Sequence, residues 1–190
     1  MPSMSERRKA TDERIYRAAI EEFGRRGYVN TTLSNIAKSA GITPGLIVQN
    51  FGSKEELYRK ISLDITDRIY RLFSDLTDDW HNRCVTIVRR LKEQLELHEN
   101  AIVYLDFYVS LITSLDTPDD VLNELYEMYN RSPVELLIRG GQEAGDVIEG
   151  DPYSLHSLFW TTLYNTIQIC YNNKLDYPDD EWFVDVLRKH

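Results

Sequence analysis

Three side chains of one short segment have the chemistry to recognise nucleic-acid bases. In the segment PGLIVQNF, helical spacing predicts that Leu46, Gln49 and Asn50 share one face. The amides of Gln and Asn can each form two hydrogen bonds with the edge of adenine, and an apolar side chain can contact the thymine methyl group. Ile47 and Phe51 point to the opposite side and predict a buried face. The segment is a candidate for reading bases, although an ordinary helical corner with a solvated face has the same spacing.

No other group of side chains predicts catalysis or cofactor binding. His81 and Cys84 are metal-ligand types three residues apart, but no second pair follows them to complete a zinc site. The glycine-rich run 140–145 lacks the lysine and hydroxyl residue of a phosphate-binding loop and is more simply a helix end. His156 fits a hydrogen-bonded core or pocket residue, and no nucleophile elbow exists in the sequence. We therefore expect no enzymatic activity, no metal and no cofactor.

The charge distribution favours a polyanion as partner of the N-terminal segment. The chain of 190 residues has a net charge of -9. Residues 1–60 nevertheless hold 11 basic residues against 7 acidic ones, whereas the remainder holds 11 against 24. A basic segment can bind a polyanion while an acidic body avoids it. We therefore expect a domain at 1–60 and a second one at 61–190.

The residues around the candidate segment predict a helix-turn-helix unit. One helix begins after Thr32 and ends at Gly41, and the next begins with Pro44, whose missing N–H costs nothing at the first helical position. Gly52 ends this short helix, and the capping box 53–56 begins a longer one. Two short helices joined by a three-residue turn that contains glycine form this arrangement.

Helical spacing covers almost the whole chain, and no sustained alternation predicts a strand. The fold class is therefore all-α, with about nine helices: a three-helix N-terminal unit followed by a C-terminal helical bundle. The first helix is expected at 11–26. Glu22 is the one polar residue on its apolar stripe, and Gly27 is suited to the helix end. The remaining helices are expected at 54–76, 80–98, 100–115, 118–144 with a kink near Pro133, 152–172 and 179–190.

Residues 11–61 resemble the N-terminal DNA-binding domain of the TetR family of transcriptional regulators. The resemblance rests on Ile15, Ala18-Ala19, Phe23, Gly27-Tyr28, Thr31-Thr32, Ile36-Ala37, Ala40 to Gly45, and Phe51 to Leu57. It implies a homodimer that binds double-stranded operator DNA and releases it when a small-molecule effector binds the C-terminal domain. It also implies that the protein is a repressor.

The resemblance further implies roles for individual residues. Thr32 and Lys54 match positions that contact phosphates, and Ser34 matches one that contacts a base in some members. In the family, a tyrosine that contacts the DNA backbone usually follows the leucine of the reading helix. This sequence has Val48 at that position. The candidate DNA-binding residues are Thr32, Ser34, Thr43, Pro44, Gly45, Leu46, Gln49, Asn50 and Lys54.

Two sets of residues in the C-terminal part are candidates for a ligand pocket and for a dimer interface. Buried phenols need hydrogen-bond partners, and a bundle that holds several of them with an acid such as Asp106 can enclose a largely apolar pocket. The helix at 152–172 is apolar nearly all round, which requires burial on both sides, one of them against a partner subunit. The ligand candidates are Tyr104, Phe107, Tyr108, Tyr126, Tyr129, Trp160 and Tyr164, and the interface candidates are Leu155, Phe159, Leu163, Ile167 and Trp182.

The remaining expectations concern location and alternatives. Cys84 and Cys170 are expected to be reduced core residues, because two distant cysteines do not make a disulfide framework. The sequence has no apolar run of membrane-spanning length and no secretory signal, so we expect a cytoplasmic protein with no membrane partner. Two alternatives stay open: a helical protein–protein adaptor, and a TetR-like regulator that lacks a ligand.

Overall fold

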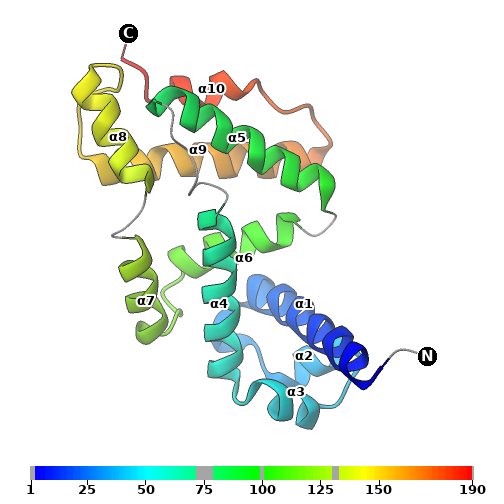
Figure 1. Ribbon diagram of the computed structural model, residues 1–190. Coiled ribbons are helices and arrows are strands. Elements are labelled where there is room, and N and C mark those ends of the chain that lie inside the picture. The colour runs from blue at the N-terminus through cyan, green and yellow to red at the C-terminus, as the bar shows by residue number, and fades with distance from the viewer. Residues whose placement is uncertain (1–2, 72–78, 99–100, 130–132, 190) are drawn as a thin grey trace. The chain divides into compact units, whose positions relative to one another are not determined.

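The computed structural model describes residues 3–71, 79–98, 101–129 and 133–189. These residues form ten α-helices and no sheet; the one β-bridge among them joins Val147 to Arg188. The helices (Figure 1) are α1 (Met4–Asn30), α2 (Leu33–Ala40), α3 (Pro44–Phe51), α4 (Lys54–Arg71), α5 (Trp80–Leu97), α6 (Ala101–Thr113), α7 (Asp119–Tyr129), α8 (Pro133–Ala144), α9 (Pro152–Asn173) and α10 (Asp180–Asp185). The prediction of an all-α chain is confirmed.

The helices divide into two compact units that do not follow the order of the chain. Unit one combines Met1–Arg68 with Asn100–Glu127, and unit two combines Ile69–Glu99 with Met128–His190. Helices α6 and α7 therefore pack with the four N-terminal helices. The predicted division at residue 60 is a division of functions and does not coincide with these packing units. It stays a prediction.

The core of unit one is built from one apolar stripe on each helix. Ile15, Ala19 and Phe23 on α1 are almost completely buried, as the helical spacing predicts. Tyr58 of α4 packs edge-on against Phe23 with ring centroids 4.8 Å apart, and against Phe107 of α6 at 5.7 Å. This aromatic cluster joins α1, α4 and α6 into one body.

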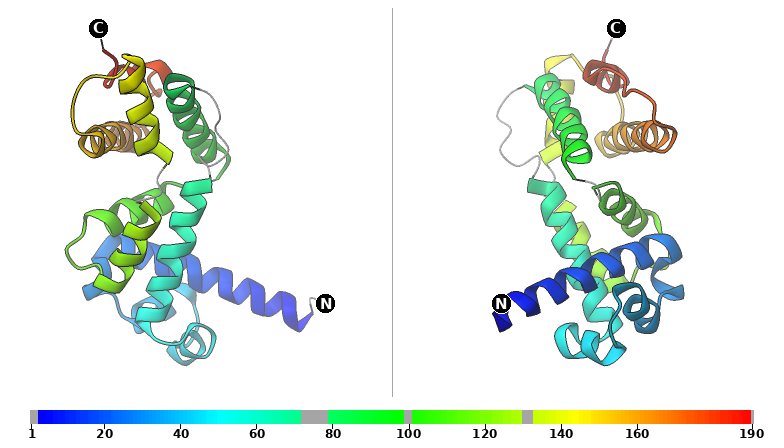
Figure 2. Two further views of the ribbon diagram at one scale, coloured as in Figure 1. Left: turned by 60° about the vertical axis from the view of Figure 1, so that its left-hand side comes forward. Right: turned by 90° about the vertical axis from the view of Figure 1, so that its right-hand side faces the viewer.

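Helix α1 is longer than the sequence predicts. It begins at Met4 rather than near residue 11, because Ser3 and Glu6 form a capping box in which Glu6 N–H donates to the Ser3 hydroxyl at 3.2 Å. Its first turns project beyond the rest of unit one (Figure 2), and residues 3–10 are all exposed. The helix is kinked at Gly27, whose φ of 75° is left-handed. The predicted break at this glycine is therefore confirmed.

Unit two packs α5, α8, α9 and α10 around a second apolar core. Phe159, Leu163 and Ile167 of α9 are fully buried there, together with Phe183 of α10. Both cysteines are free and buried, as predicted, and burial raises the pKa of Cys84 to about 12. None of the described helices is long and apolar enough to cross a membrane.

Two further predicted helices differ from the structure. The helix expected at 118–144 is two helices, α7 and α8, and the second begins at Pro133. Proline removes a backbone hydrogen bond and stands readily at the first position of a helix, so it starts a new helix here instead of kinking an old one. The last helix ends at Asp185 because the following residues turn to form the bridge with Val147. The end of the helix predicted at 54–76 lies outside the described residues.

Candidate nucleic-acid interface

Helices α2 and α3 form the predicted helix-turn-helix unit. The Thr32 hydroxyl caps α2 by accepting the Asn35 N–H at 3.2 Å. Gly41 ends α2 with a left-handed φ of 64°, and Ile42 N–H donates to the Ala37 carbonyl at 2.9 Å. The turn between the helices therefore has a fixed conformation, which sets the position of α3.

Arg14 of α1 completes the end of α2. Its guanidinium donates to the Ala40 carbonyl and, at 3.3 Å, to the Gly41 carbonyl, both of which lack partners within the helix. Its targets are main-chain carbonyls 26 and 27 residues away, so no side-chain pattern could have indicated this bond.

Helix α3 is held by one fully buried side chain and presents most of its other residues. Ile47 has no exposed surface, as predicted, and Phe51 is half-buried. Val48 is 52% exposed, and Gln49 is exposed beside it. The N-terminal residues Thr43, Pro44 and Gly45 are exposed too, and the Thr43 hydroxyl makes no capping hydrogen bond.

Leu46 and Asn50 depart from the prediction that they face outward. Both are half-buried, and Asn50 Nδ2 donates to Asp12 Oδ1 of α1 at 2.8 Å. Around the helix axis, Leu46 and Asn50 lie between the buried Ile47 and the exposed Val48 and Gln49. Gln49 is therefore the amide that lies free, whereas the Asn50 amide is already bonded. Asp12 was missed because it is 38 residues away in the sequence.

Lys54, Tyr28 and Glu55 join the start of α4 to the end of α1. Lys54 Nζ donates to the Tyr28 carbonyl at 3.0 Å and lies 4.2 Å from the centroid of the Tyr28 ring. The Tyr28 hydroxyl donates to Glu55 at 2.9 Å. Burial and this hydrogen bond raise the pKa of Tyr28 to about 12. The predicted capping box is present, because Glu56 N–H donates to the Ser53 hydroxyl at 3.2 Å and Ser53 N–H to Glu56 at 2.7 Å.

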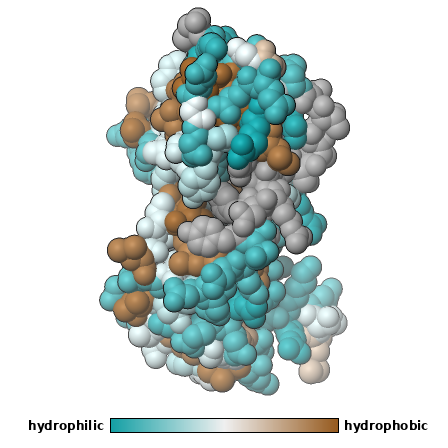
Figure 3. Space-filling view, turned by 90° about the vertical axis from the view of Figure 1, so that its left-hand side faces the viewer, coloured by the Kyte–Doolittle hydropathy of each residue, from teal (hydrophilic) through white to brown (hydrophobic). Residues whose placement is uncertain are grey.

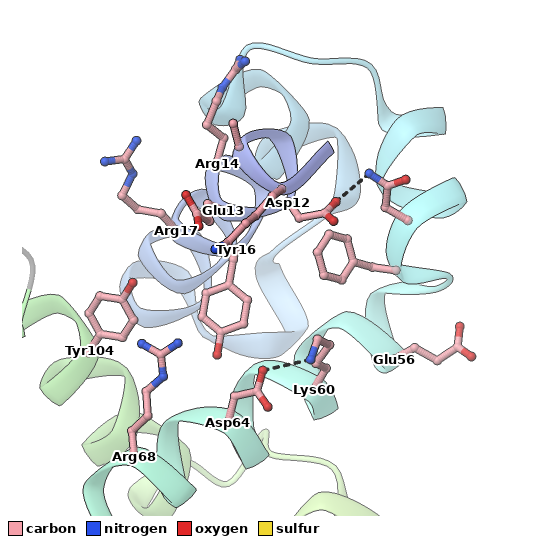
Figure 4. Close-up of a pocket in the computed structure, with 14 residues that line it drawn as sticks. Asp12, Glu13, Arg14, Tyr16, Arg17, Glu56, Lys60, Asp64, Arg68 and Tyr104 are labelled. Atoms are coloured by element: carbon pink, nitrogen blue, oxygen red, sulfur yellow. Dashed lines mark hydrogen bonds and ion pairs between the residues drawn. The ribbon is translucent and has the colours of Figure 1, made fainter. Parts of the chain in front are cut away.

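A groove of about 910 Å³ lies beside α3, between α1, α4 and the start of α6 (Figure 4). Its walls mix cations with carboxylates, and Lys60 pairs with Asp64 across 3.0 Å. The Tyr16 hydroxyl is buried and makes no hydrogen bond of good geometry with any described residue, and burial followed by the charge of Asp64 raises the pKa of Tyr16. Tyr104, a predicted ligand residue, also lines this groove.

Comparisons with known proteins agree with this geometry. The family model for bacterial regulatory proteins of the tetR family matches residues 15–61. These residues hold α2, α3, the turn between them and the first turns of α4. Over residues 15–61 the chain therefore matches the TetR family.

Curated relatives match the N-terminal part of the chain. The transcriptional regulatory protein RaaS of Mycobacterium tuberculosis is 50% identical over 44 residues, which are 23% of this chain and 20% of that protein. The regulator UidR of Escherichia coli K12 is 32% identical over 81 residues, 43% of this chain and 41% of that protein. The chain thus spans between about a fifth and about a half of the length of the curated relatives it matches. Each of these relatives is named as a transcriptional regulator.

Solved TetR-family structures share the fold of the whole chain. A TetR family regulator from Marinobacter aquaeolei VT8 has a TM-score of 0.74 at 16% identity and covers 98% of this chain and 100% of its own. One from Haemophilus influenzae has a TM-score of 0.67 at 17% identity, with 94% and 99% covered. Both extend the likeness beyond the matched N-terminal domain to the C-terminal helices.

The predicted ligand residues fall in different units. Tyr104, Phe107 and Tyr108 lie on α6 in unit one, where Phe107 belongs to the aromatic core. Trp160 and Tyr164 are half-buried on α9 in unit two. The side chains of Tyr126 and Tyr129 lie outside the described part of the chain. One pocket shared by all seven residues remains a prediction.

The predicted interface residues lie mostly inside unit two. Leu155, Phe159, Leu163 and Ile167 are between 0% and 8% exposed, and Trp182 is 47% exposed. Leu155, Phe159, Leu163 and Ile167 are thus buried within unit two, and their place at a dimer interface stays a prediction. Because α9 is apolar on several sides, its sequence could not show which stripe its own unit covers.

The apolar side chains that α9 exposes are a different set. They are Tyr153, Leu158, Ile169 and Tyr171, and the 22-residue helix has no charged residue. Leu136 of α8 is exposed as well. Figure 3 shows hydrophobic residues at the surface in several patches on one face of the protein, among hydrophilic ones.

Proposed function

We propose that the protein is a sequence-specific DNA-binding transcriptional regulator that acts as a homodimer and is released from its operator by a small molecule. The observation that carries the proposal is the α2–α3 unit, whose second helix buries Ile47 and exposes its N-terminal residues and Gln49. A short helix held in this way can enter the major groove with its free face.

The side chains of the unit divide between phosphate contact and base reading. Thr32, Ser34 and Thr43 are exposed hydroxyl residues at the starts of α2 and α3, where a helix N-terminus favours an anion. Lys54 has two N–H groups left beyond its bond to the Tyr28 carbonyl, and these can reach a phosphate. Gln49 is the amide free to pair with a base edge.

The exposed stripe of α9 supports dimerisation. A helix without charge costs little to desolvate, and its exposed side chains Leu158 and Ile169 are 11 positions apart, which places them on one face of the helix. Two operator half-sites one helical turn apart require two reading helices, and a dimer supplies them. The same stripe is the observation that favours the alternative of a protein–protein adaptor.

Release by an effector is a shift of population between two dimer forms. A small molecule that binds one form better lowers DNA affinity in proportion to that difference. In this proposal residues 1–60 bind DNA, and residues 61–190 bind the effector and form the dimer. A cytoplasmic location is part of the same proposal.

Selection from a pool of random duplexes tests the function. The purified protein, at low salt and without effector, should enrich a palindromic sequence with half-sites about one helical turn apart. Sizing of the same protein should show a dimer. If the protein enriches no sequence, the proposal of a sequence-specific regulator is contradicted. If it is also a dimer, the alternative of a protein–protein adaptor is favoured.

A further inference from the structure

The bond between Asp12 and Asn50 links α1 to the reading helix. Asn50 Nδ2 donates to Asp12 Oδ1 at 2.8 Å, and both residues are half-buried (Figure 4, dashed line at Asp12). Among the described residues this is the one hydrogen bond that Asn50 makes through its side chain. Asn50 is the last-but-one residue of α3, so the bond also restrains the end of a helix that has only Ile47 fully buried.

This bond decides which end of the Asn50 amide is free. A carboxylate has no N–H and can only accept, so the Nδ2 end of the amide must face Asp12. The other end, the carbonyl Oδ1, makes no hydrogen bond with any described residue. An asparagine without such a neighbour can turn its amide over and present either a donor or an acceptor. Asn50 presents an acceptor while the bond to Asp12 lasts.

An acceptor in the major groove distinguishes between bases. Adenine and cytosine carry exocyclic amino groups that donate there, whereas guanine and thymine offer O6, N7 and O4, which accept. Two acceptors that face each other leave both without a hydrogen bond, and a buried group without a partner is costly. An acceptor also cannot bind a phosphate oxygen.

We propose that Asp12 is a specificity-determining positioning residue: it holds the Asn50 amide so that Oδ1 faces the DNA and restricts the contacted base to adenine or cytosine. The proposal rests on the DNA-binding function proposed above. Asp12 itself touches no base, and acts through the orientation of Asn50.

The test compares base preference in full-length variants. The enriched operator is first mapped with Asn50→Ala, which identifies the base pair where preference is lost. Four duplexes that differ only at this pair are then titrated with wild type, Asp12→Ala and Asp12→Asn. Wild type should prefer adenine or cytosine over guanine or thymine by about tenfold. Both Asp12 variants should reduce this ratio to about threefold or less, since neither alanine nor an amide at position 12 fixes the Asn50 amide.

Glu13→Ala is the matched control. Glu13 is exposed, lies next to Asp12 in the sequence and lines the same groove, but bonds no residue of α3 among those described. Loss of either carboxylate should raise affinity for all four duplexes, because less negative charge faces the phosphates. Only the Asp12 variants should change the ratio, and Asp12→Ala should have no further effect on it in an Asn50→Ala background. Circular dichroism should show that Asp12→Asn, which conserves side-chain size, is folded.

Three results would overturn the inference. One is an unchanged ratio in folded Asp12→Asn that still enriches the wild-type sequence. A second is an equal change in Glu13→Ala. The third is an Asn50→Ala variant that loses affinity equally for all bases, as a phosphate contact would. A wild-type protein that enriches no sequence would overturn the regulator as well, so the two failures are distinguishable.

Discussion

At the scale of single residues, Lys54 combines a structural contact with a charge available to DNA. Its ammonium bonds the Tyr28 carbonyl and keeps two further N–H groups. We expect Lys54→Ala to weaken binding to every duplex and to lower the slope of log affinity against log salt by about 1. Lys60→Ala removes the same charge from the same helix, but Lys60 pairs with Asp64. An equal loss of slope in both variants would mean that Lys54 makes no specific phosphate contact.

Val48 offers a second test at this scale. It is 52% exposed on the reading helix, at the position where the resemblance to the family implies a backbone-contacting tyrosine. Val48→Tyr should raise affinity for all duplexes by about fivefold, because a phenol can donate one hydrogen bond to a phosphate. Val48→Phe adds the ring without the hydroxyl and should give little of this gain. Equal gains in isothermal titrations would instead indicate apolar contact.

Some residue roles could be predicted from the sequence, and others depend on distant partners. The caps at Thr32 and Ser53 and the burial of Ile47 follow from local spacing. Glu22 stood out as a flaw in an apolar stripe, yet it is buried with partners: Ser39 donates to it at 2.7 Å, and Arg26 pairs with it at 2.8 Å. The Ser39 contact spans 17 residues, so only the packing of α2 on α1 could show it.

At the scale of elements, the junction between α3 and α4 depends on one glycine. Gly52 has φ 80° and ψ -129°, and a Cβ there would meet Glu56 Oε2 at 2.0 Å. Gly52→Ala should therefore strain the backbone and displace Glu56 from the capping box, at a cost of about 1–3 kcal/mol in the free energy of unfolding. Denaturant unfolding followed by circular dichroism measures this change.

Gly45 is the matched control for this prediction. It lies within α3 with ordinary helical geometry, and a Cβ there would meet no atom within 4 Å. Gly45→Ala should stabilise the protein by about 0.5–1 kcal/mol, because alanine loses less conformational freedom on folding. If both substitutions changed stability in the same direction, backbone strain at Gly52 would not be the cause.

At the scale of the whole molecule, the division of the chain could not be read from its charge. The basic segment at 1–60 pointed to a functional domain, but α6 and α7 pack with it through contacts such as Phe23 with Phe107. The sequence shows that Phe107 is apolar and helical, and helical periodicity carries no information on which of several apolar helices it meets. For the same reason, the sequence could not show that the predicted interface residues of α9 lie on the stripe that its own unit buries.

The exposed stripe of α9 leads to the last prediction. Leu158 is 44% exposed and Ile169 57%, on a helix without charge. If this stripe meets its copy across a two-fold axis, Leu158→Glu buries two like charges and should raise the dimer dissociation constant by about a hundredfold. Light scattering after gel filtration would detect the monomer, and affinity for a palindromic operator should fall with it. Leu97→Glu is the control, since Leu97 is 73% exposed at the end of α5 and should leave the dimer intact. A dimer that survives Leu158→Glu would place the interface elsewhere.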